Sequence, residues 1–214
     1  QLQPDSKTWI KFNQSLSDSY QIPFESHAVT VDNKSHAGVE AAAREARYNC
    51  FAKLLNQNQN KKILVTAHHL NDQAETFLLQ LMRGAGPKGL SAMPRIKKLS
   101  HGYHLRPLLD ISRQELNSYA EQNNLTWVED KTNSDVKFDR NYIRHQVFSV
   151  IEQRWPSFIN RIAVSANNCA EHETVLSQYL QQDYHQVLQV VELADTTYAT
   201  LKISSLVNKS IEKQ

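Results

Sequence analysis

The spacing of apolar residues in the first sixty positions predicts two helices. Apolar side chains recur every three or four residues over 9–20, and Pro23 then ends the pattern. An alanine-rich stripe over 39–56 predicts a second and stronger helix. Between them, 27–31 alternates like a short strand and 33–38 has the composition of a loop.

The next seventy residues alternate strand and helix patterns. The order is strand 61–67, helix 72–82, strand 104–109, helix 112–123 and strand 126–129. The first strand is apolar without alternation, which is typical of a buried strand in a parallel sheet. Gly84 ends the first of these helices, and a capping box at Ser112 opens the second. This alternation indicates the α/β class, with a parallel sheet flanked by helices.

The pattern changes after residue 130. Residues 131–139 are polar and rich in turn formers, and 141–191 is helical except at Pro156. One more strand is expected at 198–203. We therefore expect an α/β domain over 1–140 and a mainly helical domain over 141–214.

The overall composition restricts the function only weakly. Hydrophobic residues make up 40% of the chain and charged residues 21%, as in ordinary globular proteins. The formal net charge of +2 neither demands nor excludes a nucleic-acid partner. No apolar run approaches the roughly 20 residues that span a bilayer, so we expect no membrane partner. Cys50 and Cys169 are isolated, which favours a reducing, cytoplasmic setting.

The first candidate site lies directly after the strand at 61–67. His68, Asp72 and Glu75 share a helical face, where they could hold Mg²⁺ and contact phosphate. The same residues also fit a plain helix start in which Asp72 is the N-cap. Zinc is less favoured, because the sequence places no third strong ligand.

The second candidate site is a glycine cluster that follows the helix at 72–82. Gly84, Gly86 and Gly89 are three of the five glycines in the chain, and they lie beside Arg83 and Lys88. They form either a helix end with a turn or a loop that approaches phosphate closely. The P-loop pattern GxxxxGK[ST] is absent from the chain.

Three groups of basic residues each have two interpretations. Arg44 and Arg47 form either a solvated helix face or a phosphate contact. The stretch 95–106 is either an exposed hairpin or a patch that contacts a nucleic-acid backbone. Arg140 and Arg144 share a helix face after a charged loop, which either caps the helix or serves the site.

Four stretches together resemble one family. They are GVEAAAREARY at 38–48, VTAHHLNDQAETFLLQLMRGAGPKGLSAM at 65–93, RPLL at 106–109 and WVEDKTNSDVKFDRNYIR at 127–144. These stretches resemble the tRNA(Ile)-lysidine synthetases, which belong to the PP-loop ATP pyrophosphatases. The resemblance implies a reaction in which ATP adenylates the wobble cytidine of a tRNA(Ile) with a CAU anticodon. Free lysine then attacks carbon two of that base, and AMP leaves.

The resemblance also implies roles for individual residues. Asp72, His69, Arg140 and Arg144 would be catalytic, with Asp72 also near Mg²⁺ and one of the two arginines contacting the adenylated intermediate. The ATP-binding residues would be His68, His69, Arg47, Arg83, Gly84 and Gly86. The expected cofactors are ATP and Mg²⁺, the expected partners are tRNA(Ile) and free lysine, and the assembly could be a homodimer.

The chain also departs from the family pattern. No SGGxDS pyrophosphate loop occurs in it, and the HHGL segment expected before Gln1 is absent. We therefore expect these 214 residues alone to be inactive in lysidine formation. The alternatives are a related tRNA thiolase, disfavoured because its iron–sulfur centre needs clustered cysteines, a non-catalytic RNA-binding protein, and a zinc hydrolase.

Overall fold

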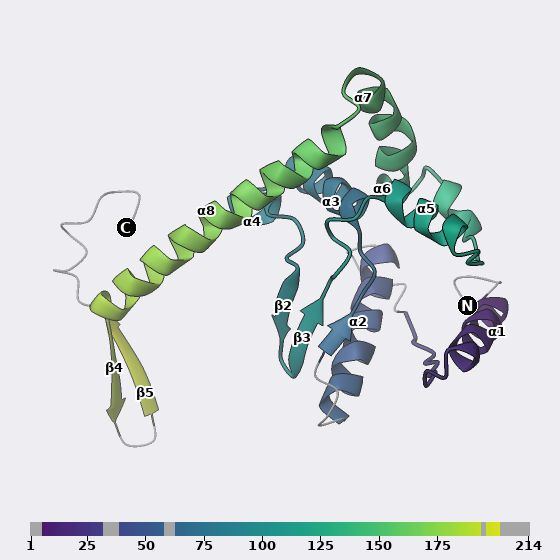
Figure 1. Cartoon of the computed structure of the whole chain (residues 1–214). Coiled ribbons are helices and arrows are strands. Elements are labelled where there is room, and N and C mark those ends of the chain that lie inside the picture. The colour runs from purple at the N-terminus through teal and green to yellow at the C-terminus, as the bar shows by residue number, and fades with distance from the viewer. Residues whose placement is uncertain (1–5, 32–38, 58–62, 194–195, 202–214) are drawn as a thin grey trace. The chain divides into compact units, whose positions relative to one another are not determined.

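The computed structural model describes residues 6–31, 39–57, 63–193 and 196–201 (Figure 1). Its α-helices are α1 (Ser6–Ser19), α2 (Val39–Gln57), α3 (Leu70–Met82), α4 (Pro87–Leu90), α5 (Arg113–Gln122), α6 (Asp139–Tyr142), α7 (Phe148–Arg154) and α8 (Phe158–Val187). Its strands are β1 (Ile63–Val65), β2 (Ile96–Leu99), β3 (Gly102–Leu105), β4 (Leu188–Leu193) and β5 (Thr196–Leu201).

The chain forms two compact units, which are described separately. One unit comprises residues 1–73 and 94–154, and the other comprises 74–93 and 155–214. The domain boundary expected near residue 140 stays a prediction.

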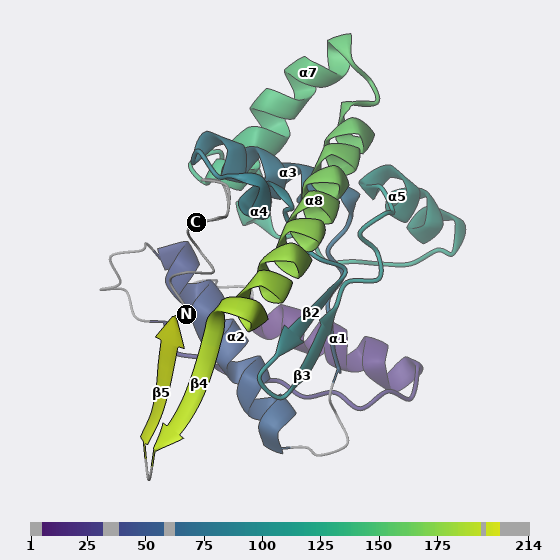
Figure 2. The same ribbon diagram turned by 90° about the vertical axis from the view of Figure 1, so that its left-hand side faces the viewer.

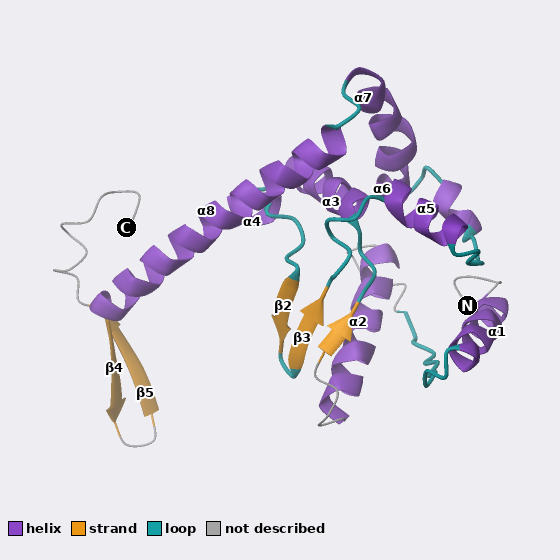
Figure 3. Ribbon diagram, viewed as in Figure 1, coloured by secondary structure: helices purple, strands orange, loops and turns teal. Residues whose placement is uncertain are grey.

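The first unit contains a three-stranded sheet in the order β1-β3-β2 (Figure 3). Strand β1 pairs with β3 in parallel, as expected for the first strand, while β2 and β3 form an antiparallel hairpin. Helix α2 lies alongside β1 (Figure 1). The α/β class is therefore confirmed, and the small sheet is mixed because the hairpin turns the chain back at Ser100 and His101.

The register of β1 against β3 gathers polar side chains on one face of this sheet. Leu64 is paired with His104, so Thr66, two residues further on, lies on the same face as His104. Arg106 follows on that face, and both His104 and Arg106 are buried. Tyr48 of α2 reaches this face, with its ring centroid 5.8 Å from that of His104.

The expectation that β1 is a buried strand is wrong for two of its three residues. Ile63 and Val65 are 61% and 56% exposed. In the described sheet β1 is an edge strand, and these two residues alternate with Leu64, which shares the face that carries His104.

Local signals predicted the helices well. Helices α1, α2 and α5 match the expected ranges to within a few residues. The Ser112 side chain accepts from the backbone N–H of Glu115, whose carboxylate accepts from the N–H of Ser112, so the capping box is confirmed. Helix α3 begins at Leu70, two residues before the expected start at Asp72.

Two expected strands do not form. Residues 27–31 and 126–129 lie outside any helix or strand. All of these residues except Val31 are exposed, and no other segment in the described part of the molecule pairs with them as a strand. A strand needs such a partner, and alternation alone cannot supply one. The expected loop at 33–38 lies outside the described residues.

In the second unit, α4 packs against the long helix α8 (Figure 2). The helix break expected at Pro156 is confirmed, because α7 ends at Arg154 and α8 begins at Phe158. The strand expected at 198–203 overlaps β5, which pairs with β4, a strand that the sequence did not predict. Among the described residues, none of the helices has the length and apolar character needed to cross a bilayer.

Candidate functional site

A pocket of about 250 Å³ opens where the chain leaves β1. It is lined by Arg47, Tyr48 and Phe51 from α2 and by Thr66, Ala67 and His68 after the strand. The carboxyl end of a parallel strand is where open α/β sheets bind ligands. The pocket therefore combines a guanidinium, an imidazole and two aromatic rings at the expected place.

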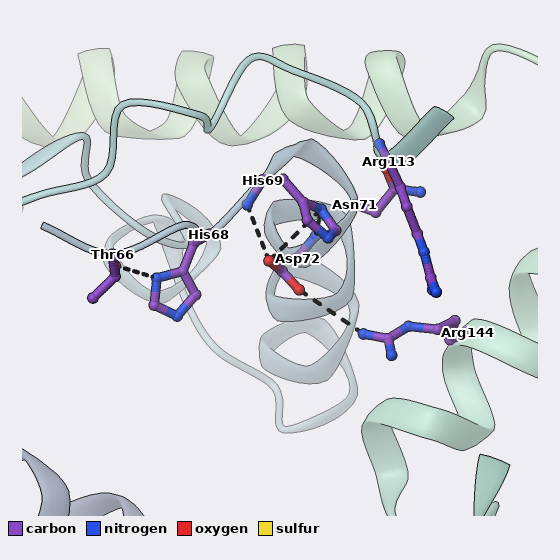
Figure 4. Close-up of polar contacts among 7 residues, drawn as sticks. All are labelled: Thr66, His68, His69, Asn71, Asp72, Arg113 and Arg144. Atoms are coloured by element: carbon purple, nitrogen blue, oxygen red, sulfur yellow. Dashed lines mark hydrogen bonds and ion pairs between the residues drawn. The ribbon is translucent and has the colours of Figure 1, made fainter. Parts of the chain in front are cut away.

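A continuous hydrogen-bonded chain runs from the buried face of the sheet to this pocket. Thr66 Oγ1 lies 2.6 Å from His68 Nδ1 and 2.8 Å from His104 Nε2. Figure 4 shows the first of these contacts. The other ring nitrogen of His104, Nδ1, lies 3.0 Å from Arg106 Nη2. Arg106 is held by the carbonyl of Pro94, which accepts from Nη1 at 2.7 Å.

Burial keeps His104 and His68, the two histidines of this hydrogen-bonded series, neutral. Burial, together with the charge of Arg106, lowers the pKa of His104 to about 4. Burial also lowers the pKa of His68, although the carboxylate of Asp72 opposes the shift. Both imidazoles are therefore mainly neutral near pH 7, and a neutral imidazole has one donor and one acceptor nitrogen.

Two arginines of α2 lie beside the ring of Tyr48. The guanidinium carbons of Arg44 and Arg47 are 5.0 and 5.9 Å from its centroid. Contacts of this kind attract a cation to the ring face and orient it. Only Arg47 lines the pocket, so it is the better placed of the two to contact a phosphate.

His69 and Asp72 form the start of α3. The backbone N–H of His69 donates to Asp72 Oδ2 at 3.0 Å, and the N–H of Asp72 points to His69 Nδ1 at 3.4 Å (Figure 4). This is a reciprocal capping box with His69 as the N-cap and Asp72 at the third helical position. The interpretation of Asp72 itself as the N-cap is therefore wrong by three residues.

Arg144 brings a charge from a distant part of the sequence to this helix start. Its Nη2 lies 3.9 Å from Asp72 Oδ1, and both side chains are largely buried. Arg144 belongs to a π-helical segment, Ile143–Val147, and such segments occur frequently at functional sites. Burial lowers the pKa of His69, Asp72 opposes the shift, and the charge of Arg144 is among the further lowering causes.

Arg140 lies near the other histidine. After burial, which is the main cause of the lowered pKa of His68, the positive charge of Arg140 contributes to the same shift. The structure therefore brings Arg47, Arg140 and Arg144 to the same region as His68, His69 and Asp72, all within the first unit.

The expected trio of metal ligands does not form. No group of three or more His, Cys, Asp or Glu side chains in the described part of the chain is arranged to hold a metal ion. Glu75 is fully buried, and one oxygen of Asp72 is bound to the helix start. Asp72 fits Mg²⁺ only as a single carboxylate ligand beside phosphate oxygens, which is common for this ion. The same finding leaves the zinc alternative without a ligand set.

The glycine cluster has local structural reasons to exist. Gly84 ends α3 with a φ of +70°, a conformation that costs other residues free energy. A Cβ added at Gly89 would lie 2.6 Å from Cβ of Ala85. Arg83, Gly84 and Gly86 belong to the second unit, so their expected place beside the pocket stays a prediction.

The basic stretch at 95–106 is a hairpin, as one of its two interpretations expected. Arg95 pairs with Asp110, and Lys97 and Lys98 are exposed. His104 and Arg106 are instead buried and serve the chain that leads to His68. Sequence reasoning missed this role, and it also missed Thr66, Tyr48 and Phe51. For Thr66, the feature of the sequence that could have pointed to this role is its position directly after the strand.

Comparison with known proteins shows which family the chain belongs to. The family model for the PP-loop domain matches residues 1–151. A tRNA(Ile)-lysidine synthase of Coxiella burnetii is 47% identical over 192 residues, which cover 90% of this chain and 42% of that protein. Another from Haemophilus ducreyi is 42% identical, covering 89% of this chain and 44% of that protein.

A third relative extends the similarity to the end of the chain. The tRNA(Ile)-lysidine synthase of Actinobacillus pleuropneumoniae serotype 3 is 39% identical over 213 residues, covering the whole chain and 48% of that protein. The chain thus spans somewhat less than half the length of these curated relatives. Because the PP-loop model covers well over half of it, the chain belongs to the PP-loop domain family.

Proposed function

We propose that this chain is part of an enzyme that makes lysidine. The enzyme would use ATP to adenylate the wobble cytidine of a tRNA(Ile) with a CAU anticodon, and lysine would then replace AMP at carbon two. Relatives named for this activity align along 84–100% of the chain. We further propose a cytoplasmic enzyme, since its substrate is a tRNA, and a homodimeric assembly.

The observation that carries the proposal is the pocket after β1. Arg47 and His68 face it from α2 and from the end of the strand, and Tyr48 and Phe51 supply aromatic walls. A cation and an imidazole N–H suit phosphate oxygens, and the rings suit a planar base. We assign the phosphates of ATP to this pocket.

Asp72, His69, Arg140 and Arg144 would form the second part of the site. Asp72 and Arg144 face each other at 3.9 Å. An incoming phosphate could therefore pair with Arg144, and an incoming amine could pair with Asp72. Mg²⁺, when bound by Asp72 and phosphate oxygens, would offset the negative charge of the phosphates. The guanidinium groups would stabilise the charge that develops as pyrophosphate leaves. We also propose an ATP-binding role for Arg83, Gly84 and Gly86.

The activity can be tested with the full-length protein, ATP, lysine and an unmodified tRNA(Ile) transcript that carries the CAU anticodon. Mass spectrometry of the wobble nucleoside should show the mass of cytidine joined to lysine with loss of water. The reaction should require ATP and should release AMP. A tRNA with the cytidine replaced by uridine is the matched control and should stay unmodified.

The same assay separates the alternatives. A thiolase would add sulfur in place of lysine when it is given a sulfur donor. An RNA-binding protein would retain the tRNA without consuming ATP. Either result, obtained with folded protein, would contradict the proposal.

A further inference from the structure

The hydrogen-bonded chain behind the pocket has a defined direction. A guanidinium has only donors, so Arg106 Nη2 must donate to His104 Nδ1. Since His104 is neutral, its proton is on Nε2, and that N–H donates to Thr66 Oγ1 at 2.8 Å. Arg106 thus fixes the tautomer of a histidine that is 0% exposed.

The Thr66 hydroxyl continues the same donor-to-acceptor order towards His68. Its oxygen already accepts from His104, and its own proton has an acceptor 2.6 Å away in His68 Nδ1. If Nδ1 carried the proton, the hydroxyl would accept twice, and its proton would have no acceptor among the described residues. The arrangement that satisfies every group has an unprotonated Nδ1 and a proton on Nε2 of His68.

We infer that Thr66, His104 and Arg106 are positioning residues that hold His68 as its Nε2–H tautomer, so that this N–H serves as a donor to a phosphate group in the pocket. None of the three was expected to serve the site. Arg106 and His104 are buried and act only through Thr66, and Thr66 also lines the pocket itself.

The chemistry of the pocket decides what the donor binds. Arg47 presents a positive charge to the same space, and the described residues that line the pocket include no carboxylate. A neutral imidazole N–H beside a guanidinium suits an anion with several oxygens. The identification of that anion as a phosphate of ATP rests on the proposed function, whereas the tautomer of His68 does not.

The tautomer can be measured directly. Full-length protein labelled with nitrogen-15 histidine gives spectra that separate protonated from unprotonated ring nitrogens, and a His68→Gln variant assigns the signals. We expect an unprotonated Nδ1 and a protonated Nε2 in the wild type. Thr66→Val removes the hydroxyl at nearly constant volume and should give a mixture of tautomers. Thr66→Ser keeps the hydroxyl and should restore the single form.

ATP affinity, measured by calorimetry on the same proteins, tests the consequence. Loss of a fixed donor to a charged phosphate should weaken ATP binding roughly tenfold in Thr66→Val, and Thr66→Ser should recover most of it. In a His68→Gln background, the Thr66→Val change should have little further effect, because it acts through His68. If Thr66→Val does not fold, His104→Gln interrupts the same chain one position earlier.

The possible results separate this inference from the proposed function. A wild-type His68 protonated at Nδ1 overturns the inference whatever the protein binds. So does a Thr66→Val variant with an unchanged tautomer and unchanged ATP affinity. If wild-type protein has the Nε2–H tautomer but does not bind ATP, the positioning role stands and both the phosphate assignment and the proposed function fail.

Discussion

At the scale of single residues, the site depends on histidines that are kept neutral in different ways. His104 is held between a guanidinium and a hydroxyl, and His69 accepts a backbone N–H at a helix start. Both contacts use a lone pair that protonation would remove. Burial favours the same neutral state, so geometry and electrostatics agree for each ring.

The burial of His104 predicts a pH dependence of stability. Its pKa is near 4 in the folded protein and near 6.5 when unfolded, so the unfolded chain binds more protons between these values. The stabilising contribution is complete above pH 6.5 and is lost as the pH falls towards 4. It amounts to at most about 3.4 kcal/mol.

Urea unfolding at pH 7.5 and pH 4.5 measures this contribution. The free energy of unfolding should fall less between the two pH values in His104→Gln than in the wild type. His101→Gln, at an exposed position in the same hairpin, is the control and should match the wild type. If the free energy of unfolding falls by the same amount between the two pH values in all three proteins, His104 does not govern this loss of stability.

At the scale of elements, local signals were readable from the sequence and non-local ones were not. Ser112 and Glu115 are three residues apart, so their capping box could be predicted from neighbours alone. The strand expected at 27–31 failed because alternation does not provide a pairing partner. From the sequence, His104 looked like part of an exposed basic stretch. Its burial depends on the register of β3 against β1, which the sequence alone does not reveal.

The start of α3 illustrates why the candidate site was only partly predictable. The sequence correctly drew attention to His69 and Asp72, but it could not show that they cap one helix reciprocally. A residue can both cap a helix and serve a site, and a substitution that keeps the cap separates the two roles.

His69→Asn provides that separation, because asparagine is a favoured N-cap. We expect its melting temperature to stay close to that of the wild type. Lysidine formation should fall on the order of tenfold or more if the imidazole also contacts a charged phosphate, as we propose. Ser112→Ala, which removes the cap of α5, is the matched control and should lose about 1 kcal/mol of stability with little loss of activity. Unchanged activity in His69→Asn would reduce His69 to a helix cap.

At the scale of the whole molecule, the pocket lies within the part of the chain that the PP-loop family model matches. The PP-loop model covers residues 1–151, which include every residue that lines the pocket and every member of the hydrogen-bonded chain behind it. The chain spans less than half the length of the relatives, so the complete activity stays a proposal. The chain itself supplies a pocket lined by Arg47 and His68, to which we assign an anion.

A crystal structure of the full-length protein with bound ATP tests this central claim most directly. We predict a phosphate oxygen within hydrogen-bonding distance, about 3 Å, of His68 Nε2, with Arg47 contacting the same nucleotide. Clear density for ATP with its phosphates elsewhere, and only solvent between Arg47 and His68, would contradict the account.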